Sequence, residues 1–253
     1  MAERTRGIQS IEVGGRILQA LTDACAPMAL KDLTHAADLA PAQCHAYLTS
    51  FKTLGFVEQD SQSGQYKLGP FAMRLGMARM RSYPVTDRAS RMLIDLSNRL
   101  GKVAMMLVWG PHGPTVVQFQ NGTAAVTLNL RQGTVYSVTG TASGRVFAAF
   151  DRNEVVESAI DAELSGKVTE RFVGLTQSRQ DFEEAVERDR ARRYSATEGM
   201  PVPGLNAISV PVFDSSGQMC LAISIFGAAA ELPTTPDSPH VLEMIATSRA
   251  LSG

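Results

Sequence analysis

The sequence has no apolar run as long as a membrane-spanning helix. Its strongly apolar stretches, such as residues 220–230, fall well short of the roughly 18 to 20 residues that cross a bilayer. The N-terminal residues MAERTRGIQS are not followed by the apolar segment of a signal peptide either. The sequence therefore predicts a cytoplasmic protein that does not enter the membrane.

Metal-ligand spacing is also missing. The three cysteines, Cys25, Cys44 and Cys220, are widely separated, and together with the four histidines they form neither a CxxC nor an HExxH pattern. We therefore expect free thiols in a reducing compartment, no zinc site and no cofactor.

The composition is that of a globular protein, with 44% apolar and 19% charged residues in a chain of 253, a length that fits one large domain or two smaller ones. The net charge of −1 is unevenly distributed. Residues 1–81 contain nine Lys or Arg against seven Asp or Glu, which leaves 15 basic and 18 acidic residues for the rest. This sign difference suits a nucleic-acid contact at the N-terminal end.

The first 69 residues have the pattern of a winged helix-turn-helix domain. Apolar residues from Ile8 to Leu21 recur at helical spacing, and two further helices are expected over residues 30–39 and 41–54. Gly55 can end the last of these in a left-handed conformation, after which residues 56–69 alternate as a hairpin does.

A linker helix is predicted over residues 70–83, because Pro84 pushes the residue before it out of the helical region. Residues 84–253 then form a second domain. Helical segments are expected over residues 88–101, 143–150, 178–193 and 240–252, and six strands over residues 103–109, 114–119, 124–130, 193–199, 205–213 and 219–226. This content predicts an α+β domain with a six-stranded antiparallel sheet covered by helices.

The helix over residues 41–54 has small side chains on the face opposite its expected buried stripe of Cys44, Leu48 and Phe51. At about 100° per residue, that opposite face carries Ala42, Ala46, Thr49, Ser50 and Thr53. Small residues let a helix approach base edges closely, and Gln43 on the flank can pair with adenine. His45 lies on the flank too. The phosphate contacts would come from Arg4, Arg6, Arg16, Lys31, Lys52 and Lys67.

Two other classes of protein were weighed. A smooth face of Ala and Thr also suits packing against protein, so the domain could be a binding module with no salt-dependent affinity for DNA. An enzyme is not expected, because residues 140–144 read GTASG rather than GxSxG and neither His112 nor His240 has an evident catalytic partner.

Four motifs, in order and along nearly the whole chain, resemble the IclR family of bacterial transcription regulators. They are IQSIEVGGRILQAL, then LAPAQCHAYLTSFKTLGFVEQD with GQYKLGP, then TGTASGRVFAAF, and finally PGLNAISVPVFDSSGQMCLAISIFG. The resemblance implies a GAF-like second domain, dimers formed largely through the N-terminal domains, and often dimers of dimers. It also implies control of small-molecule catabolism by an organic acid effector that binds against the sheet near the start of a helix.

The sequence departs from the family at the recognition helix, which usually begins with Pro-Lys-Ser-Thr and contains an arginine. Here the matching positions are Ala40, Pro41, Ala42, Gln43 and Ala46, so the operator sequence does not carry over.

The effector positions implied by the resemblance are altered as well. They are Ala142, Ser143, Gly144, Thr197, Leu205, Ala207, Ser224 and Phe226. Thr141 is expected to cap the helix that begins near Ala142 and to leave amide groups for an anion, with Ser143 or Ser224 as further donors. Ala207 and Phe226 stand where relatives keep polar groups, which favours an effector with an apolar or aromatic body and one acidic end. The alternative is that Ser224 and Phe226 merely fill the core.

Overall fold

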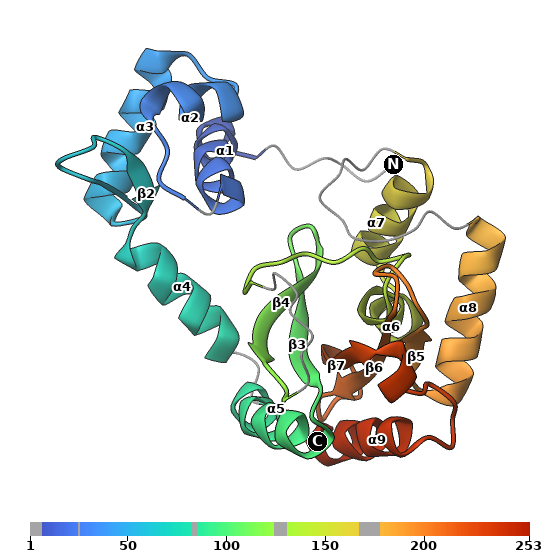
Figure 1. The fold of residues 1–253 in the computed structure, drawn as a ribbon. Coiled ribbons are helices and arrows are strands. Elements are labelled where there is room, and N and C mark those ends of the chain that lie inside the picture. Colours follow the sequence, from blue (N-terminus) through green and yellow to red (C-terminus); the bar gives the residue numbers. More distant parts are fainter. Residues whose placement is uncertain (1–6, 25, 82–84, 124–130, 167–177) are drawn as a thin grey trace. The chain divides into compact units, whose positions relative to one another are not determined.

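The computed structural model describes residues 7–24, 26–81, 85–123, 131–166 and 178–253. Its chain divides into two compact units, residues 1–82 and residues 83–253 (Figure 1). None of the described helices is long and apolar enough to cross a membrane.

The first unit is a winged helix-turn-helix domain followed by a helix. Its elements are α1 (Gln9–Ala24), α2 (Leu30–Ala36), α3 (Pro41–Leu54), β1 (Val57–Gln59), β2 (Tyr66–Leu68) and α4 (Pro70–Arg81). The three helices and the hairpin enclose one apolar core that includes Ile17, Leu33 and Leu48, all at most 1% exposed. Gly55 ends α3 with φ of 77°, a left-handed conformation that glycine adopts without steric cost.

The second unit is built on an antiparallel sheet. Its elements are α5 (Thr86–Leu100), β3 (Val103–Gly110), β4 (Gly113–Gln120), α6 (Ala142–Phe150), α7 (Glu154–Leu164), α8 (Arg179–Arg192), β5 (Ser195–Thr197), β6 (Leu205–Phe213), β7 (Met219–Ala228), the 3₁₀ turn η1 (Ala229–Glu231) and α9 (Pro239–Leu251). Neighbouring strands run in the order β4-β3-β7-β6-β5.

The prediction of six strands was wrong for the described residues, where this sheet has five. The expected third strand falls on residues 124–130, which lie outside the described residues. Helix α7 was not predicted, although Asn153 accepts hydrogen bonds from the amides of Val155 and Val156 as an N-cap and the buried Val156 and Ile160 are one turn apart.

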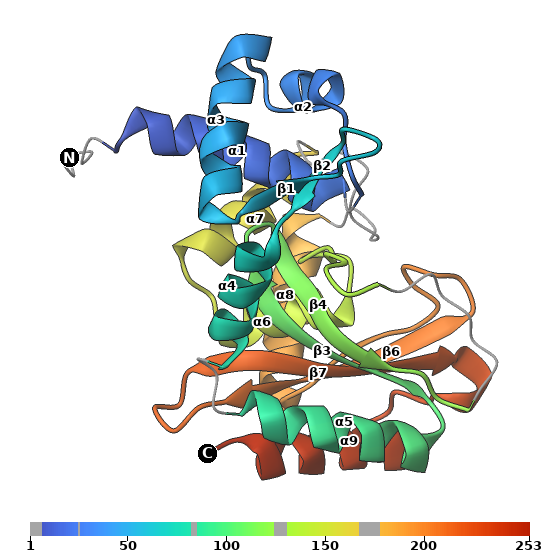
Figure 2. The same cartoon turned by 90° about the vertical axis from the view of Figure 1, so that its left-hand side faces the viewer.

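Helices cover both faces of the sheet. Figure 2 shows α5 and α9 side by side along one face, with α6 and α8 on the other. Helix α5 buries Ala89, Leu93 and Leu96, an i, i+4, i+7 stripe, while its charged residues are all exposed. Helix α6 is short and almost wholly buried, and its Val146 and Phe147 pack against the strand residues that face it. This buried helix and the sheet beneath it enclose the cavity described below.

Candidate functional site

The exposed face of α3 is small and almost uncharged, as predicted from its periodicity. Cys44 and Leu48 are buried in the core of the first unit. The side chains expected to contact DNA from this helix are all exposed, namely Ala42, Gln43, His45, Ala46, Thr49 and Lys52. The structure thus presents them together on the surface.

Three hydroxyl groups on this face are turned back toward the helix itself. Thr49 Oγ1 donates to the carbonyl of His45 at 2.9 Å, Thr53 Oγ1 to that of Thr49 at 3.1 Å, and Ser50 Oγ to that of Ala46 at 3.3 Å. A hydroxyl has only one hydrogen to donate. What these residues offer outward is therefore methyl groups and acceptor lone pairs.

The wing is tied to α3 by a short polar chain. Lys52 Nζ donates to Gln59 Oε1 at 2.9 Å, and Gln59 Nε2 donates to the carbonyl of Gly64 at 2.9 Å across the hairpin turn. Asp60 holds that turn by accepting from the amide of Ser63 at 2.7 Å, a bond that lowers the pKa of its carboxyl group. These contacts link the end of α3 to the hairpin and close its turn.

The predicted phosphate contacts are surface side chains, where the structure describes them. Arg16 lies 3.7 Å from Asp38, and Lys67 lies 2.9 Å from Glu58. Lys31 is exposed at the start of α2. Exposed ion pairs of this kind contribute little to stability, so these cations can exchange a carboxylate for a phosphate at small cost. Arg4 and Arg6 lie outside the described residues.

A cavity of about 230 Å³ lies in the second unit, between the sheet and the start of α6. Six of the eight predicted effector positions line it, namely Ala142, Ser143, Thr197, Leu205, Ala207 and Phe226. Three of them share one row across the sheet, because Phe226 pairs with Ala207 and Ala207 with Thr197 on successive strands. The strand pairing explains why residues so far apart in sequence meet.

Gly144 does not line this cavity, and its amide is not free. The amide donates to Thr141 Oγ1 at 2.9 Å, the capping bond expected from the sequence. A Cβ at Gly144 would lie 2.1 Å from the carbonyl oxygen of Ser137, so glycine is needed here for close packing. The amides of Ala142 and Ser143 lie in the first turn of α6, where no helical acceptor exists, and the helix dipole favours an anion there.

Ser224 does not line the cavity either, but it is hydrogen-bonded to Ser143. Ser209 Oγ donates to the carbonyl of Ile223 at 3.4 Å, Ser224 Oγ donates to Ser209 Oγ at 2.7 Å, and Ser143 Oγ lies 2.9 Å from Ser224 Oγ. Because the carbonyl can only accept and each hydroxyl has one hydrogen, Ser143 donates to Ser224. In this arrangement both serine hydrogens are used within the row of hydroxyl groups, whereas the sequence predicts these serines as further donors to a carboxylate.

The rest of the cavity wall is largely apolar. Met105 and Tyr136 were not predicted and lie on it, with the phenol of Tyr136 3.7 Å from the sulfur of Met105. Burial raises the pKa of Tyr136 to about 12, so the phenol is neutral. Met105 pairs with Ser224 across the sheet, and strand alternation could have revealed it. Thr197 Oγ1 is buried with no hydrogen-bond partner among the described residues.

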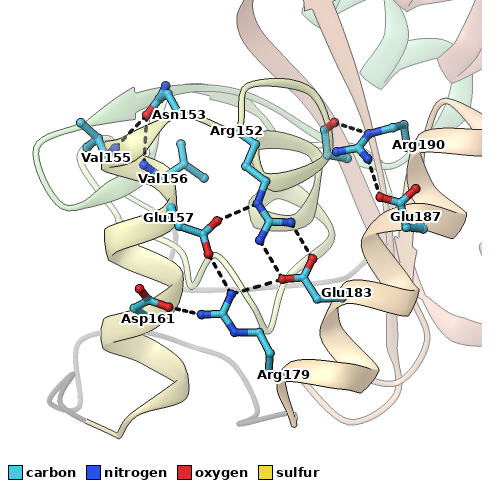
Figure 3. A network of polar contacts seen from close by, with 11 residues as sticks. Arg152, Asn153, Val155, Val156, Glu157, Asp161, Arg179, Glu183, Glu187 and Arg190 are labelled. Atoms are coloured by element: carbon cyan, nitrogen blue, oxygen red, sulfur yellow. Dashed lines mark hydrogen bonds and ion pairs between the residues drawn. The ribbon is translucent and has the colours of Figure 1, made fainter.

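An ion pair with α8 also holds helix α6. Arg145, 8% exposed, donates to Asp189 of α8 at 2.9 Å, and Asp189 also accepts from Arg192 at 2.6 Å. A second network joins α7 to α8, where Figure 3 shows Arg152 and Arg179 between Glu157 and Glu183. These contacts hold the helices around the cavity in place. Among the described residues, no group of three His, Cys, Asp or Glu side chains is arranged to hold a metal ion.

Comparison with known proteins adds to this geometry. The family model of the bacterial transcriptional regulator IclR C-terminal domain matches residues 77–252, and that of the IclR helix-turn-helix domain matches residues 10–61. The chain is 28% identical over 248 residues to a glycerol operon regulatory protein of Streptomyces griseus, covering 96% of this chain and 93% of that protein.

Several solved structures are also similar to this one. HmgR of Pseudomonas aeruginosa is 31% identical, with 97% of each chain covered and a TM-score of 0.60. An IclR homologue of Microbacterium hydrocarbonoxydans, crystallised with 4-hydroxybenzoate, is 16% identical, covers 96% of this chain and 97% of its own, and has a TM-score of 0.76.

Proposed function

The chain belongs to the IclR family of bacterial transcriptional regulators, and we propose that its DNA binding is controlled by an aromatic or otherwise apolar carboxylic acid. Members of this family are DNA-binding regulators with a ligand-binding C-terminal domain, and they are not enzymes. The alternative of a binding module whose winged helix contacts protein instead of DNA therefore loses its support.

The cavity wall carries the proposal about the effector. One end holds the start of α6, where the amides of Ala142 and Ser143 and the helix dipole favour a negative group. The body is formed by Met105, Ala207 and Phe226, whose side chains offer mainly apolar contact. A ligand with one carboxylate and an apolar body matches both ends.

A relative of the same fold supports this class of effector. The homologue from Microbacterium hydrocarbonoxydans was crystallised with 4-hydroxybenzoate, an aromatic acid. The hydrogen bonds from Ser143 to Ser224 and from Ser224 to Ser209 also bear on the ligand. Because Ser143 donates its hydrogen to Ser224, it can accept a hydrogen bond from a ligand but cannot donate one to a carboxylate. Any carboxylate at this end is therefore held by backbone amides.

Calorimetric titration of the full-length protein tests the proposal. We would titrate benzoate, 4-hydroxybenzoate and phenylacetate alongside oxoacids of two to four carbons. Binding of an aromatic acid is the expected result. Binding of the short oxoacids alone would show that the effector class is wrong.

Replacing the phenyl ring gives a sharper form of the same test. The Phe226→Ser variant should bind an aromatic acid more weakly by about 1 to 3 kcal/mol, because it loses apolar contact with the ring. Its affinity for glyoxylate or pyruvate should hardly change, so these acids are the matched ligand control. An equal loss for both kinds of ligand would mean that Phe226 only maintains the fold.

A further inference from the structure

Glu163, near the end of α7, holds the loop that leads into α6. Its carboxylate accepts four hydrogen bonds from three consecutive residues. Two come from side chains, Ser137 Oγ at 2.7 Å and Thr139 Oγ1 at 2.7 Å. Two come from backbone amides, Val138 at 2.7 Å and Thr139 at 2.9 Å. Charge-assisted bonds in this number fix both the loop and the carboxylate.

The residues on either side of this loop form the cavity wall. Tyr136 precedes the three bound residues and Thr141 follows them, and both line the cavity. Ser137 also accepts from the amide of Gly140 at 2.9 Å, and its carbonyl accepts from Thr141 Oγ1 at 2.8 Å. A continuous polar path therefore runs from Glu163 to the residue that caps α6.

Glu163 occupies the amides that an anion would otherwise find in this loop. Between Val138 and Gly144, the amides of residues 138 and 139 donate to Glu163, that of Gly140 to Ser137 Oγ and that of Gly144 to Thr141. The amides of Thr141, Ala142 and Ser143, at the start of α6, have no helical acceptor. A second anion close to Glu163 would also be repelled by its charge.

We propose that Glu163 is the positioning residue of the effector cavity: it holds residues 137–139 so that Tyr136 and Thr141 form the wall, and it confines the carboxylate of the effector to the first turn of α6. The inference rests on the proposed function, since it assigns a role in binding that effector. Glu163 itself does not line the cavity.

The structure makes Glu163 accessible to experiment. Helix α7 is also held by the network of Figure 3, in which Glu157 and Asp161 pair with Arg152 and Arg179, so it stays docked without Glu163. Glu163 lies at the edge of an open groove of about 510 Å³ beside Trp109 and Ser158. A small carboxylate can enter by this groove and replace the missing one.

The test compares Glu163→Ala with Glu154→Ala in the full-length protein. Glu154 is an exposed carboxylate of the same helix, and the contacts described for α7 do not involve it. With 4-hydroxybenzoate and phenylacetate as probes, Glu163→Ala should bind at least about tenfold more weakly because buried donors lose their acceptor. Added acetate should restore part of the affinity. Glu154→Ala should bind as the native protein does, and the effector-free affinity for DNA from upstream of the gene should be unchanged in both.

Three outcomes decide the matter. Unchanged affinity in Glu163→Ala would overturn the proposal while leaving the proposed function intact. Loss of DNA binding together with effector binding, without rescue by acetate, would also overturn it, because the residue would then only maintain the fold. If the native protein binds none of the acids, the proposed function fails, and hydrogen exchange of residues 134–145 decides whether Glu163 orders the wall. Faster exchange in Glu163→Ala than in Glu154→Ala supports that role, and equal exchange refutes it.

Discussion

Ser195 and Thr197 of β5 each have a buried hydroxyl without a hydrogen-bond partner among the described residues. A buried hydroxyl that makes no hydrogen bond costs free energy, since it has given up its bonds to water. The two differ in position, because Thr197 lines the cavity and Ser195 does not. Thr197 therefore retains an unused bond that a ligand can make, whereas the unpaired Ser195 is a structural cost alone.

We predict that Thr197→Val and Ser195→Ala both leave the unfolding free energy of the effector-free protein unchanged or raise it by up to about 1 kcal/mol. Only Thr197→Val should weaken effector binding, by about 2- to 10-fold, because only it removes a hydroxyl from the cavity wall. Denaturant unfolding and calorimetry check the two parts. Equal effects of both variants on binding would remove Thr197 from the site.

The recognition helix and its wing show a division of labour at the scale of the element. The exposed face of α3 offers methyl groups and acceptor oxygens, while the cations lie around it on α1, α2, the flank of α3 and the wing. Methyl groups can contact thymine, and cations neutralise phosphates. We therefore propose that the small residues read the sequence and that the surrounding cations provide the affinity.

Lys52→Ala or Arg16→Ala should weaken binding to every DNA sequence and flatten its salt dependence, since each lost phosphate contact removes about one released counterion. Gln43→Ala should instead change the preference among sequences. Binding to cognate and scrambled duplexes across a salt series separates the two effects. The division of labour is wrong if both kinds of variant behave alike.

The network between α7 and α8 depends on pH. Hydrogen bonds from Arg152 lower the pKa of Glu157 and of Glu183 from the ordinary value of 4.5. The folded protein thus binds these protons less readily than the unfolded chain does. The network therefore contributes to stability above pH 4.5, and this contribution is lost as the pH falls through the lowered pKa values of the two carboxyl groups. The side chains are 38% and 34% exposed, so the contribution is small.

The double variant Glu157→Gln, Glu183→Gln should therefore be less stable than the native protein near neutral pH, by less than about 1 kcal/mol. The difference should shrink as the pH falls below 4.5 through the lowered pKa values, because the two carboxylates of the native protein then become protonated. Unfolding by urea at neutral pH and at a series of acidic pH values measures it. A difference that persists in acid would assign it to packing.

At the scale of the whole molecule, helix α4 at the end of the first unit carries exposed apolar side chains. None of its residues is buried, and Met73, Leu75 and Met77 are 64%, 46% and 52% exposed. A monomer rarely leaves such a helix uncovered. We propose a homodimer that covers it and reads an operator with two-fold symmetry, with a dimer of dimers as a further assembly.

Light scattering at micromolar concentration should give the mass of a dimer or of a multiple of it. The double variant Met73→Glu, Met77→Glu should dissociate to monomers, because it places charge in the proposed interface, and it should lose affinity for the symmetric operator. Arg74→Gln, on the same helix, is the control and should remain a dimer. A native monomer would contradict the proposal.

The sequence by itself determined the helix boundaries and buried faces that depend on neighbouring residues. The spacing of Cys44 and Leu48 defines the buried face of α3, Gly55 supplies its left-handed end, and Thr141 caps α6. Each of these depends on residues within one or two helical turns, which a single sequence displays. The four motifs added the family and, through it, six of the residues that line the cavity.

Only the tertiary structure decided which of those positions meet, and in what roles. Ser143 of α6 and Ser224 of β7 are 81 residues apart, and only the packing of the helix on the sheet brings their hydroxyls together. Gly144 fills a packing role, because the loop before α6 passes close to it. Glu163 binds residues more than 20 positions away in the chain. The spacing of apolar residues along the sequence does not predict such contacts, because they depend on how elements far apart in the chain pack together.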